Sequence, residues 1–475
     1  MPTETRTAQE KALRINLEAR RFGTFAEIGA GQEVARWFFH AGKASATVAK
    51  SISAYDMSIS DSLYGPAEHY VSRPRLEAML DREFGSLVER VGATGRAGDR
   101  FFVYADTVAT HGSKRRGDHG GHRWLGVRFQ TQAGGEPSEI IAHIDMLDGH
   151  TIDQQQAVGL AGVNLVYGAF YHPDDPGTLI GILLDELGRE RMEVDLIKFS
   201  GPAFTGVDNR LMTLQLVQQN LTDVATFTAA GEVVQSAETL STKPVLMVRG
   251  RFRPITKVVM DATDRAREQF EEDWGKDHTA VVMEMTLNNL MSDEAIDHQD
   301  FLARVDLLGK LGFQVMISNY TTFDRVTQYL RQYTCEPVGM VMGIPTLRQV
   351  LDEKYYQDLN GGLLEGLGRL FSGPVKLLVY PTIEAGSEKL VAADTLDVPD
   401  HQKNLYAHLI GNGFIEAIRK FDVANLGIRS ADVLAKLQAG DREWEKMAPS
   451  EVVRLIQAKS LFGYHASAPT AAGKA

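Results

Sequence analysis

The stretch KPVLMVRGRFRPITK, residues 243–257, decides the fold of the C-terminal half of the chain. Its apolar run Val245–Val248 predicts a buried strand, and the Gly250 and Pro254 that follow predict a turn. Four similar apolar runs come later, at residues 280–285, 314–318, 338–342 and 375–380. Helical patterns separate or follow them, at residues 260–274, 298–312, 322–333, 346–371 and 403–420. This alternation predicts a parallel sheet that is covered by helices on both faces.

The N-terminal half predicts a mixed arrangement of strands and helices. Strands are expected at residues 24–28, 47–55, 101–110, 123–131 and 138–147, with helices around them. We therefore predict an α/β fold with three parts. They are a mixed α+β domain with a glycine loop over residues 1–205, a βα-repeat, Rossmann-like parallel-sheet domain over 206–425, and a helical C-terminal cap with a disordered tail over 426–475.

Composition and charge narrow the class of protein. The chain has 475 residues, of which 44% are hydrophobic and 24% charged, as in globular proteins. Its net charge of −12 argues against general nucleic-acid binding, which needs a basic surface. No apolar window is long enough for a transmembrane helix, and the charged N-terminus lacks the apolar core of a signal peptide. The single cysteine, Cys335, excludes an internal disulfide. We expect a cytoplasmic protein that binds no membrane.

Three arginines, Arg249, Arg251 and Arg253, follow the strand predicted at 245–248. A guanidinium group is planar, always charged and bidentate toward phosphate or carboxylate, so this turn predicts a site for a nucleotide or another phosphorylated small molecule. In a doubly wound sheet, ligands bind beyond the carboxyl ends of the strands, where Ser318 and Thr321 are also expected. Such residues equally serve as turn and helix-capping residues, and this alternative stays open.

The turn resembles the first motif of the nucleotidyltransferases that make NAD precursors, G-x-F-x-P-x-T/H-x-G-H. Gly250, Phe252, Pro254 and Thr256 match the motif, whereas residues 257–259, Lys-Val-Val, follow where that family has Gly-His nearby. The segment ISNYTTFDR, residues 317–325, is similar to that family's second motif, I-S-S-T-x-x-R. Its threonine comes one residue late and its arginine two residues late.

This resemblance implies adenylyl transfer from ATP, with Mg²⁺, to a pyridine mononucleotide. Arg251 and Thr256 would be the catalytic residues, with Thr256 at the transfer site. The other implied residues contact the nucleotide and its phosphates; they are Arg249, Gly250, Arg253, Ser318 and Thr321. No residue is assigned as a metal ligand.

As a whole, the chain resembles a bacterial family whose members carry the name nicotinate-nucleotide adenylyltransferase or TonB-dependent receptor. The segments that carry this resemblance are EIGAGQEVARWFF at 27–39, SAYDMSISD at 53–61, RGRFRPITKV at 249–258 and NGGLLEGLGRLF at 360–371. The first name agrees with the motifs above. The second disagrees with the N-terminus, which shows no signal peptide.

A glycine loop near the N-terminus supports a different hypothesis. Gly29 and Gly31 lie between a predicted strand and a helix, and Asp56 ends the next predicted strand. This is the context of a dinucleotide or adenosyl-methionine site, in which glycines allow close approach and an acid binds the ribose. The sequence EIGAG also resembles the first motif of adenosyl-methionine-dependent methyltransferases. A turn without any ligand would show the same pattern.

Two further interpretations concern assembly and a loop. The aromatic segment 37–39 and the helical C-terminal cap allow a non-catalytic scaffold that self-associates as a homo-oligomer. The loop 111–122 is rich in histidine, glycine and basic residues. It suits a metal, an anion or plain solvent exposure, and the sequence does not decide among these.

Overall fold

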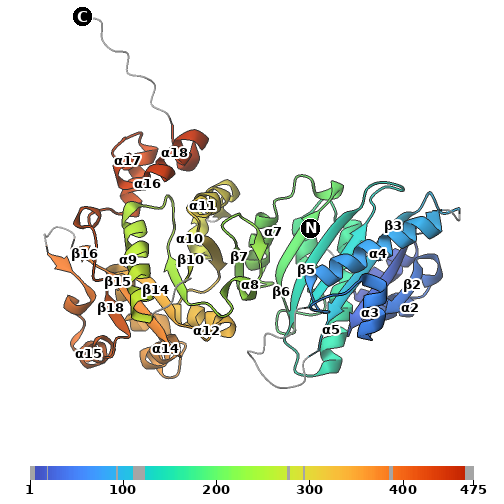
Figure 1. Cartoon of the computed structure of the whole chain (residues 1–475), viewed down its shortest axis with the longest axis horizontal. Helices are drawn as coiled ribbons and strands as arrows, with labels where there is room; N and C mark the ends of the chain where they lie inside the picture. Colours follow the sequence, from blue (N-terminus) through green and yellow to red (C-terminus); the bar gives the residue numbers. More distant parts are fainter. Residues whose placement is uncertain are drawn as a thin grey trace, which may run out of the picture. The chain divides into compact units, whose positions relative to one another are not determined.

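The chain forms two compact units in this computed structural model, Met1–Ala225 and Thr226–Ala475 (Figure 1). The structure describes residues 6–18, 20–92, 95–110, 123–274, 279–292, 295–384 and 389–465. The boundary predicted after residue 205 lies inside the first unit. The loop 111–122 and the tail after residue 465 lie outside the described residues.

A mixed six-stranded sheet forms the centre of the first unit. Its strand order is β2-β1-β3-β4-β5-β6, in which β1 is parallel to β2 and β3, and β3 to β6 are antiparallel neighbours. The strands are β1 Arg21–Gly29, β2 Val48–Ser53, β3 Arg100–Val108, β4 Trp124–Phe129, β5 Ser138–Met146 and β6 Met192–Ser200. The mixed α+β character predicted for this part is confirmed.

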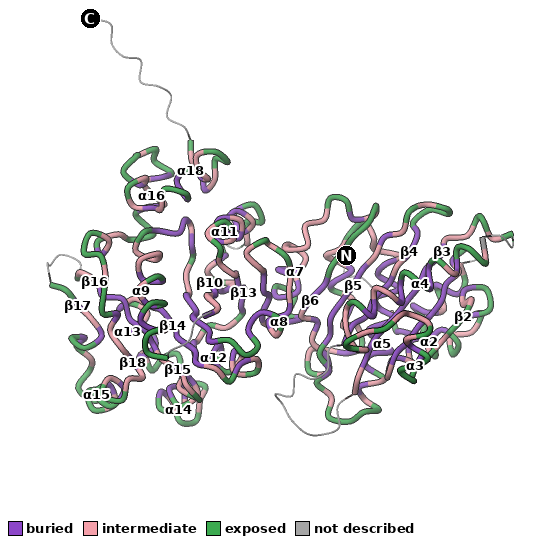
Figure 2. The backbone as a smooth tube through the Cα atoms, in the orientation of Figure 1, coloured by how far each residue is buried: buried purple, intermediate pink, exposed green. Residues whose placement is uncertain are grey.

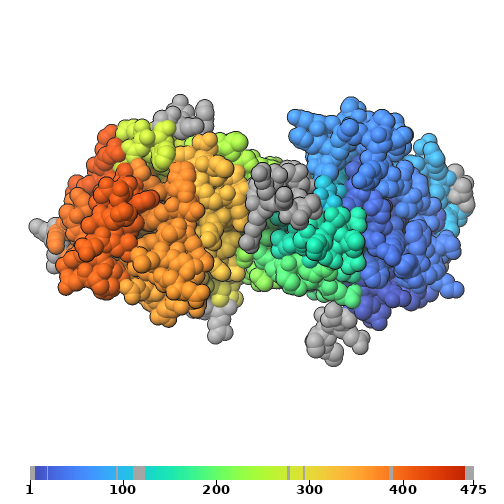
Figure 3. All heavy atoms as spheres, turned by 90° about the horizontal axis from the view of Figure 1, so that it is seen from below, coloured from blue at the N-terminus to red at the C-terminus, as the bar shows by residue number. Residues whose placement is uncertain are grey.

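Helices cover both faces of this sheet. On one face, α1 Ala8–Asn16, α2 Glu33–Ala41 and α5 Thr151–Tyr171 pack against one another. The first and third of these adjoin in the space-filling view, where dark blue meets teal (Figure 3). On the other face, α4 Arg73–Gly92 packs on β3 and β4, where Leu76 and Leu80 lie against Gly126. The remaining helices of the unit are α3 Met57–Tyr64, α6 Pro176–Gly181 and α7 Asn209–Gln218.

The second unit contains an eight-stranded sheet with the order β18-β15-β14-β9-β10-β13-β7-β8. The six strands from β18 to β13 are parallel. They are β9 Val245–Arg249, β10 Ala280–Thr286, β13 Gln314–Ser318, β14 Val338–Gly343, β15 Val375–Tyr380 and β18 Ile415–Ala417. Numbered along the chain, their order is 3-2-1-4-5-6, which is that of a Rossmann-type sheet. The edge carries β7 Val224–Phe227 and β8 Val233–Val234. The central strands are buried (Figure 2).

The helices of the second unit follow the predicted alternation. Between and after the strands lie α8 Ser236–Leu240, α9 Lys257–Trp274, α10 Leu287–Leu290, α11 His298–Lys310, α12 Phe323–Tyr333, α13 Ile344–Val350, α14 Gly362–Leu370 and α15 Lys403–Gly411. Two-stranded hairpins add β11 Met291–Ser292 with β12 Ala295–Ile296, and β16 Thr382–Ile383 with β17 Leu390–Val391. The predicted cap consists of α16 Ser430–Gln438, α17 Trp444–Met447 and α18 Ser450–Lys459.

One predicted helix, residues 403–420, ends early. Helix α15 stops at Gly411, and Gly413 has a φ of +71°, which a helix cannot continue. The chain then forms the short strand β18, in which Ile415 pairs with Leu377. A three-residue strand shows no periodicity in the sequence, so the pattern gave no sign of it.

Candidate functional site

A cavity of about 320 Å³ lies at the carboxyl ends of β9, β10, β13 and β14. In the order 3-2-1-4-5-6, the chain leaves β9 toward one side of the sheet and later returns to β14 on its other side. Ligands of doubly wound proteins bind beside such a reversal, beyond the carboxyl ends of the strands. The residues that line the cavity are Arg249, Gly250, Arg251, Thr286, Asn288, Asn289, Thr321, Thr322, Phe323, Thr346, Gln349, Val350, Tyr355 and Tyr356.

Arg249, the last residue of β9, is held by a buried carboxylate. Its Nε and Nη2 lie 2.5 and 2.8 Å from the two oxygens of Glu284, which is fully buried in β10. Its Nη1 donates to the carbonyl oxygen of Thr321 at 3.0 Å, and its guanidinium lies 4.4 Å from the ring centre of Phe323. The charge of Arg249 is therefore balanced within the protein, and this arginine shapes the wall of the cavity.

A second ion cluster holds the turn that follows β9. Arg304, fully buried in α11, pairs with Asp300 and donates to the carbonyl oxygens of Arg251 and Asn289 at 3.1 and 2.8 Å. Burial lowers the pKa of Arg304, and the attraction of Asp300 opposes this effect. Arg253 also reaches Asp300, with its Nε 2.5 Å from the carboxylate. Arg253 therefore fixes the turn and does not line the cavity.

Arg251 differs from Arg249 and Arg253. It is exposed at the cavity, and its side chain makes no hydrogen bond or ion pair with any described residue. Around the turn, Arg249 pairs with Glu284, and Arg253 and Arg304 pair with Asp300. Arg251 joins none of these pairs and presents its positive charge to the cavity.

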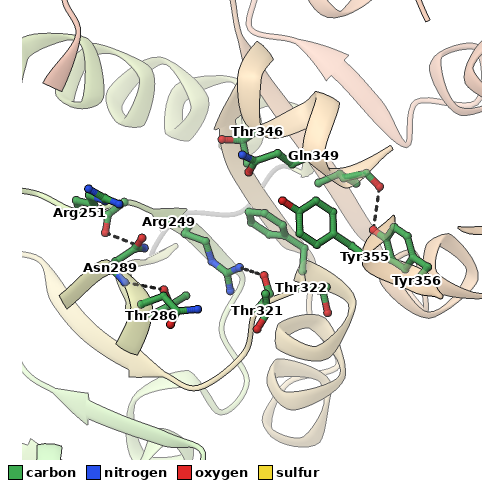
Figure 4. A pocket seen from close by; sticks show the side chains of 14 residues that line it. Arg249, Arg251, Thr286, Asn289, Thr321, Thr322, Thr346, Gln349, Tyr355 and Tyr356 are labelled. Carbon is green, nitrogen blue, oxygen red and sulfur yellow. Dashed lines mark hydrogen bonds between the residues drawn. The ribbon is translucent and has the colours of Figure 1, made fainter. Parts of the chain in front are cut away.

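The other lining residues are hydroxyls, amides and aromatic rings. Figure 4 shows Arg251, Thr286 and Asn289 on one side, Thr346, Gln349 and Tyr355 on the other, and Arg249 between them. No carboxylate is among the described residues that line the cavity. This lining suits a polar ligand that carries negative charge.

Four more predicted residues take different positions. Thr321 lines the cavity, as expected from its place after β13. Ser318 is buried and donates to Glu284 at 2.5 Å, so it supports the carboxylate that binds Arg249. Thr256 is fully buried just before α9 and does not line the cavity. Gly250 lines it, and a Cβ there would lie 2.8 Å from the ring of Phe252, so this glycine makes room for a buried ring.

The N-terminal glycine loop packs against a buried acid. A Cβ on Gly31 would lie 2.0 Å from the carboxylate of Asp106, at the carboxyl end of β3. Gly29 has a φ of +88°, which a residue with a side chain rarely adopts. Asp56 is exposed and caps α3 by accepting from the N–H of Ile59. Gly31 is itself buried, and these three positions have structural explanations.

Several residues that line or support the cavity were not predicted from the sequence. Glu284 interrupts the apolar strand AVVMEMT, and such a lone charge in a buried strand is a detectable sign of an internal ion pair. Gln349 and Tyr355 reach the cavity from α13 and the turn after it. Nothing in their local sequence distinguishes them from ordinary helix and turn residues.

The fold and this cavity define a doubly wound α/β protein with a cationic, polar crevice at its switch point. No protein-family model matches the chain, and no curated protein is significantly similar to it. Among solved structures, the competence/damage-inducible protein CihA from Agrobacterium tumefaciens is 17% identical, with a TM-score of 0.24, over 36% of this chain and 96% of its own. A CinA superfamily protein from Enterobacter cloacae is 14% identical, with a TM-score of 0.25, over 36% and 95%. At such scores these likenesses carry no functional conclusion.

Among the described residues, no helix has the length and apolar character needed to cross a membrane. No three of their histidine, cysteine, aspartate or glutamate side chains gather closely enough to hold a metal ion. The loop 111–122, which the sequence left open as a metal or anion site, lies outside the described residues.

Proposed function

We propose that the cavity beside β9 and β14 binds a nucleotide, with the phosphate at Arg251. The observation that carries this proposal is the exposed Arg251 without an internal partner, at the switch point of a Rossmann-type sheet. Around it, Thr286, Asn289 and Gln349 offer donors and acceptors suited to a ribose, and Tyr355 offers an exposed ring on which a base can stack. A volume of about 320 Å³ lies at the lower end of the range for small-molecule sites.

The finer form of the proposal is adenylyl transfer from ATP to a pyridine mononucleotide. The residues do not fit a protein-held Mg²⁺, because the lining has no carboxylate and both oxygens of Glu284 are engaged by Arg249 and Ser318. Any Mg²⁺ would have to enter with the triphosphate, and we assign no step to it. The role of Arg251 in this form is to bind and orient a phosphate.

Two alternative hypotheses from the sequence receive less support. A scaffold without ligands needs no open crevice at the strand ends, and a cavity lies there. An adenosyl-methionine or dinucleotide site needs accessible glycines, and Gly31 is buried against Asp106. The nucleotide proposal for the second unit is therefore the one that we develop.

The test compares Arg251→Gln with Arg267→Gln in calorimetric titrations with ATP, AMP and nicotinamide mononucleotide. Arg267 lies on α9, pairs with Glu271 and does not line the cavity, so its variant controls for the loss of one charge. Losing a charged hydrogen bond costs about 1.5–3 kcal/mol, so Arg251→Gln should weaken nucleotide binding roughly 10- to 100-fold. Equal affinity in both variants, or no binding by the unmodified protein at millimolar nucleotide, would refute the proposal. Product formation from ATP and the mononucleotide separately tests the transfer reaction.

A further inference from the structure

A second, larger cavity, of about 580 Å³, lies within the first unit between α1, α5 and α6. Its lining includes three basic residues of the N-terminal segment, Arg6, Lys11 and Arg14, together with Tyr167 and Tyr171 near the end of α5. All of these belong to one compact unit, and none of them belongs to the site described above. The cavity therefore needs an explanation of its own.

Two guanidiniums converge on one phenol oxygen in this cavity. The hydroxyl oxygen of Tyr167 accepts from Nη1 of Arg14 at 2.7 Å and from Nη1 of Arg6 at 3.3 Å. The guanidinium of Arg14 also lies 4.0 Å from the ring centre of Tyr171. Among the described residues, no carboxylate pairs with Arg6 or Arg14. Two like charges are thus held close together without a counter-ion among the residues that the structure describes, an arrangement that favours a bound anion.

The acidic groups nearby are already engaged. Asp185, the one carboxylate among the described lining residues, lies 2.6 Å from Nζ of Lys11. Lys11 is buried and also donates to Asn164 at 2.7 Å; burial lowers its pKa, and Asp185 opposes that effect. Glu18 accepts from Tyr171 and pairs with Arg21, so within the described part of the chain it does not pair with Arg6 or Arg14.

The other described titratable groups near the cavity do not pair with Arg6 or Arg14. Burial lowers the pKa of His172, so this lining residue is neutral. Asp175 caps α6 through the N–H and hydroxyl of Thr178. Glu186 accepts from the backbone N–H of Ala8 at 2.5 Å. Among the described residues, Lys11 is matched by Asp185, whereas Arg6 and Arg14 have no carboxylate partner.

We propose that this cavity binds a phosphorylated small molecule through the dianionic phosphate, which Arg6 and Arg14 contact together. A planar guanidinium pairs with two phosphate oxygens at once, so two of them match one dianion in charge and geometry. The cavity is much larger than a phosphate ion, and Tyr167 and Tyr171 form part of its wall. The organic part of the ligand therefore lies against these tyrosines. This proposal is independent of the nucleotide site.

The test is calorimetric titration of the full chain with inorganic phosphate and with phenyl phosphate, at constant ionic strength. Arg14→Gln should weaken binding of both at least tenfold, and Arg6→Gln should weaken it in the same direction. Arg36→Gln is the matched control, because Arg36 is an exposed arginine on α2 that pairs with Glu33 outside the cavity. Arg251→Gln should also leave this binding unchanged, which separates the two sites.

The outcomes are distinct. Tighter binding of phenyl phosphate than of inorganic phosphate supports an organic phosphate ester, and equal affinity would overturn the contact with the tyrosines. Unchanged affinity in Arg14→Gln and Arg6→Gln would overturn the site itself. The absence of any binding at millimolar concentrations of phenyl phosphate would also overturn it. Within the described residues, the side chain of Arg6 has one hydrogen bond, to Tyr167, so its variant keeps the test valid if Arg14→Gln unfolds the unit.

Discussion

Replacing Glu27 by glutamine should change how the stability of the first unit depends on pH. Glu27 on β1 and Asp106 on β3 are opposite one another in the parallel register, and both are buried. One oxygen of Glu27 and both oxygens of Asp106 have no hydrogen-bond partner among the described residues. Burial raises the pKa of Glu27 to about 8. Burial first, and then the charge of Glu27, raise the pKa of Asp106 well above its usual range.

The sign and size of the effect follow from the pKa of Glu27 in the unfolded chain and in the folded protein. The unfolded chain loses this proton near pH 4.5 and the folded protein near pH 8, so folding takes up a proton between them. The contribution of Glu27 to the free energy of unfolding is fully present below about pH 4.5 and is lost as the pH rises through 8. The slope is about 1.4 kcal/mol per pH unit. Between pH 5.5 and 7.5, Glu27→Gln should therefore gain stability on the order of 2–3 kcal/mol relative to the unmodified protein.

The assay is urea unfolding at pH 5.5, 6.5 and 7.5, followed by pulsed hydrogen exchange of peptides from β1 and β3. Exchange reports the first unit separately from the second, which a global signal does not. Glu89→Gln is the control, because Glu89 is exposed on α4 of the same unit. If Glu27→Gln and the unmodified protein show the same pH slope, the carboxyl is ionised in the folded protein and the reasoning fails.

Two further variants test packing and the turn after β9. Gly31→Ala should destabilise the first unit by about 1–3 kcal/mol, because its Cβ would press on Asp106. Gly85 is exposed on α4 with open space around it, so Gly85→Ala should instead stabilise the unit by about 0.5–1 kcal/mol. Thermal unfolding measures both. Arg304→Met removes one of the two arginines that pair with the buried Asp300, so it should lower the free energy of unfolding by about 3–5 kcal/mol, measured by urea unfolding. It should also speed amide exchange around residues 250–253, because Arg304 holds the carbonyl oxygen of Arg251. Exchange as slow as before would contradict this structural role of Arg304.

The parallel sheet of the second unit could be predicted from the sequence. Its strands are buried on both faces, so they appear as short apolar runs such as Val245–Val248 and Val375–Tyr380. Their ends carry turn residues, so the edge where the cavity lies was also predictable. The strand order was not, because nothing local to a strand records its neighbours. The reversal between β9 and β14, which places the cavity, emerges only from the pairing.

The roles of the three arginines could not be predicted, because their partners are distant in the sequence. Arg249 meets Glu284 from β10, and Arg253 meets Asp300 from α11. Each partner is buried, and an unpaired buried charge would be costly, so Arg249 and Arg253 are paired within the protein. Of the three arginines, Arg251 is the one that remains for a ligand. The glycine loop shows the same limit. Its strand–turn–helix pattern was correct, but Gly31 is needed to accommodate Asp106, which no local pattern reveals.

The number of basic residues in a segment thus does not by itself predict an anion site. What matters is how many of them remain without a carboxylate partner in the folded protein. The turn after β9 is rich in arginine, yet it leaves one arginine, Arg251, without a carboxylate partner among the described residues. Around α1 the basic residues are sparser, yet Arg6 and Arg14 both lack a described carboxylate partner, because Asp185 pairs with Lys11. If charge balance rather than basic density governs anion binding, the second cavity should bind a phosphate dianion at least as tightly as the first. The titrations of Arg251→Gln and Arg14→Gln against inorganic phosphate compare the two sites directly.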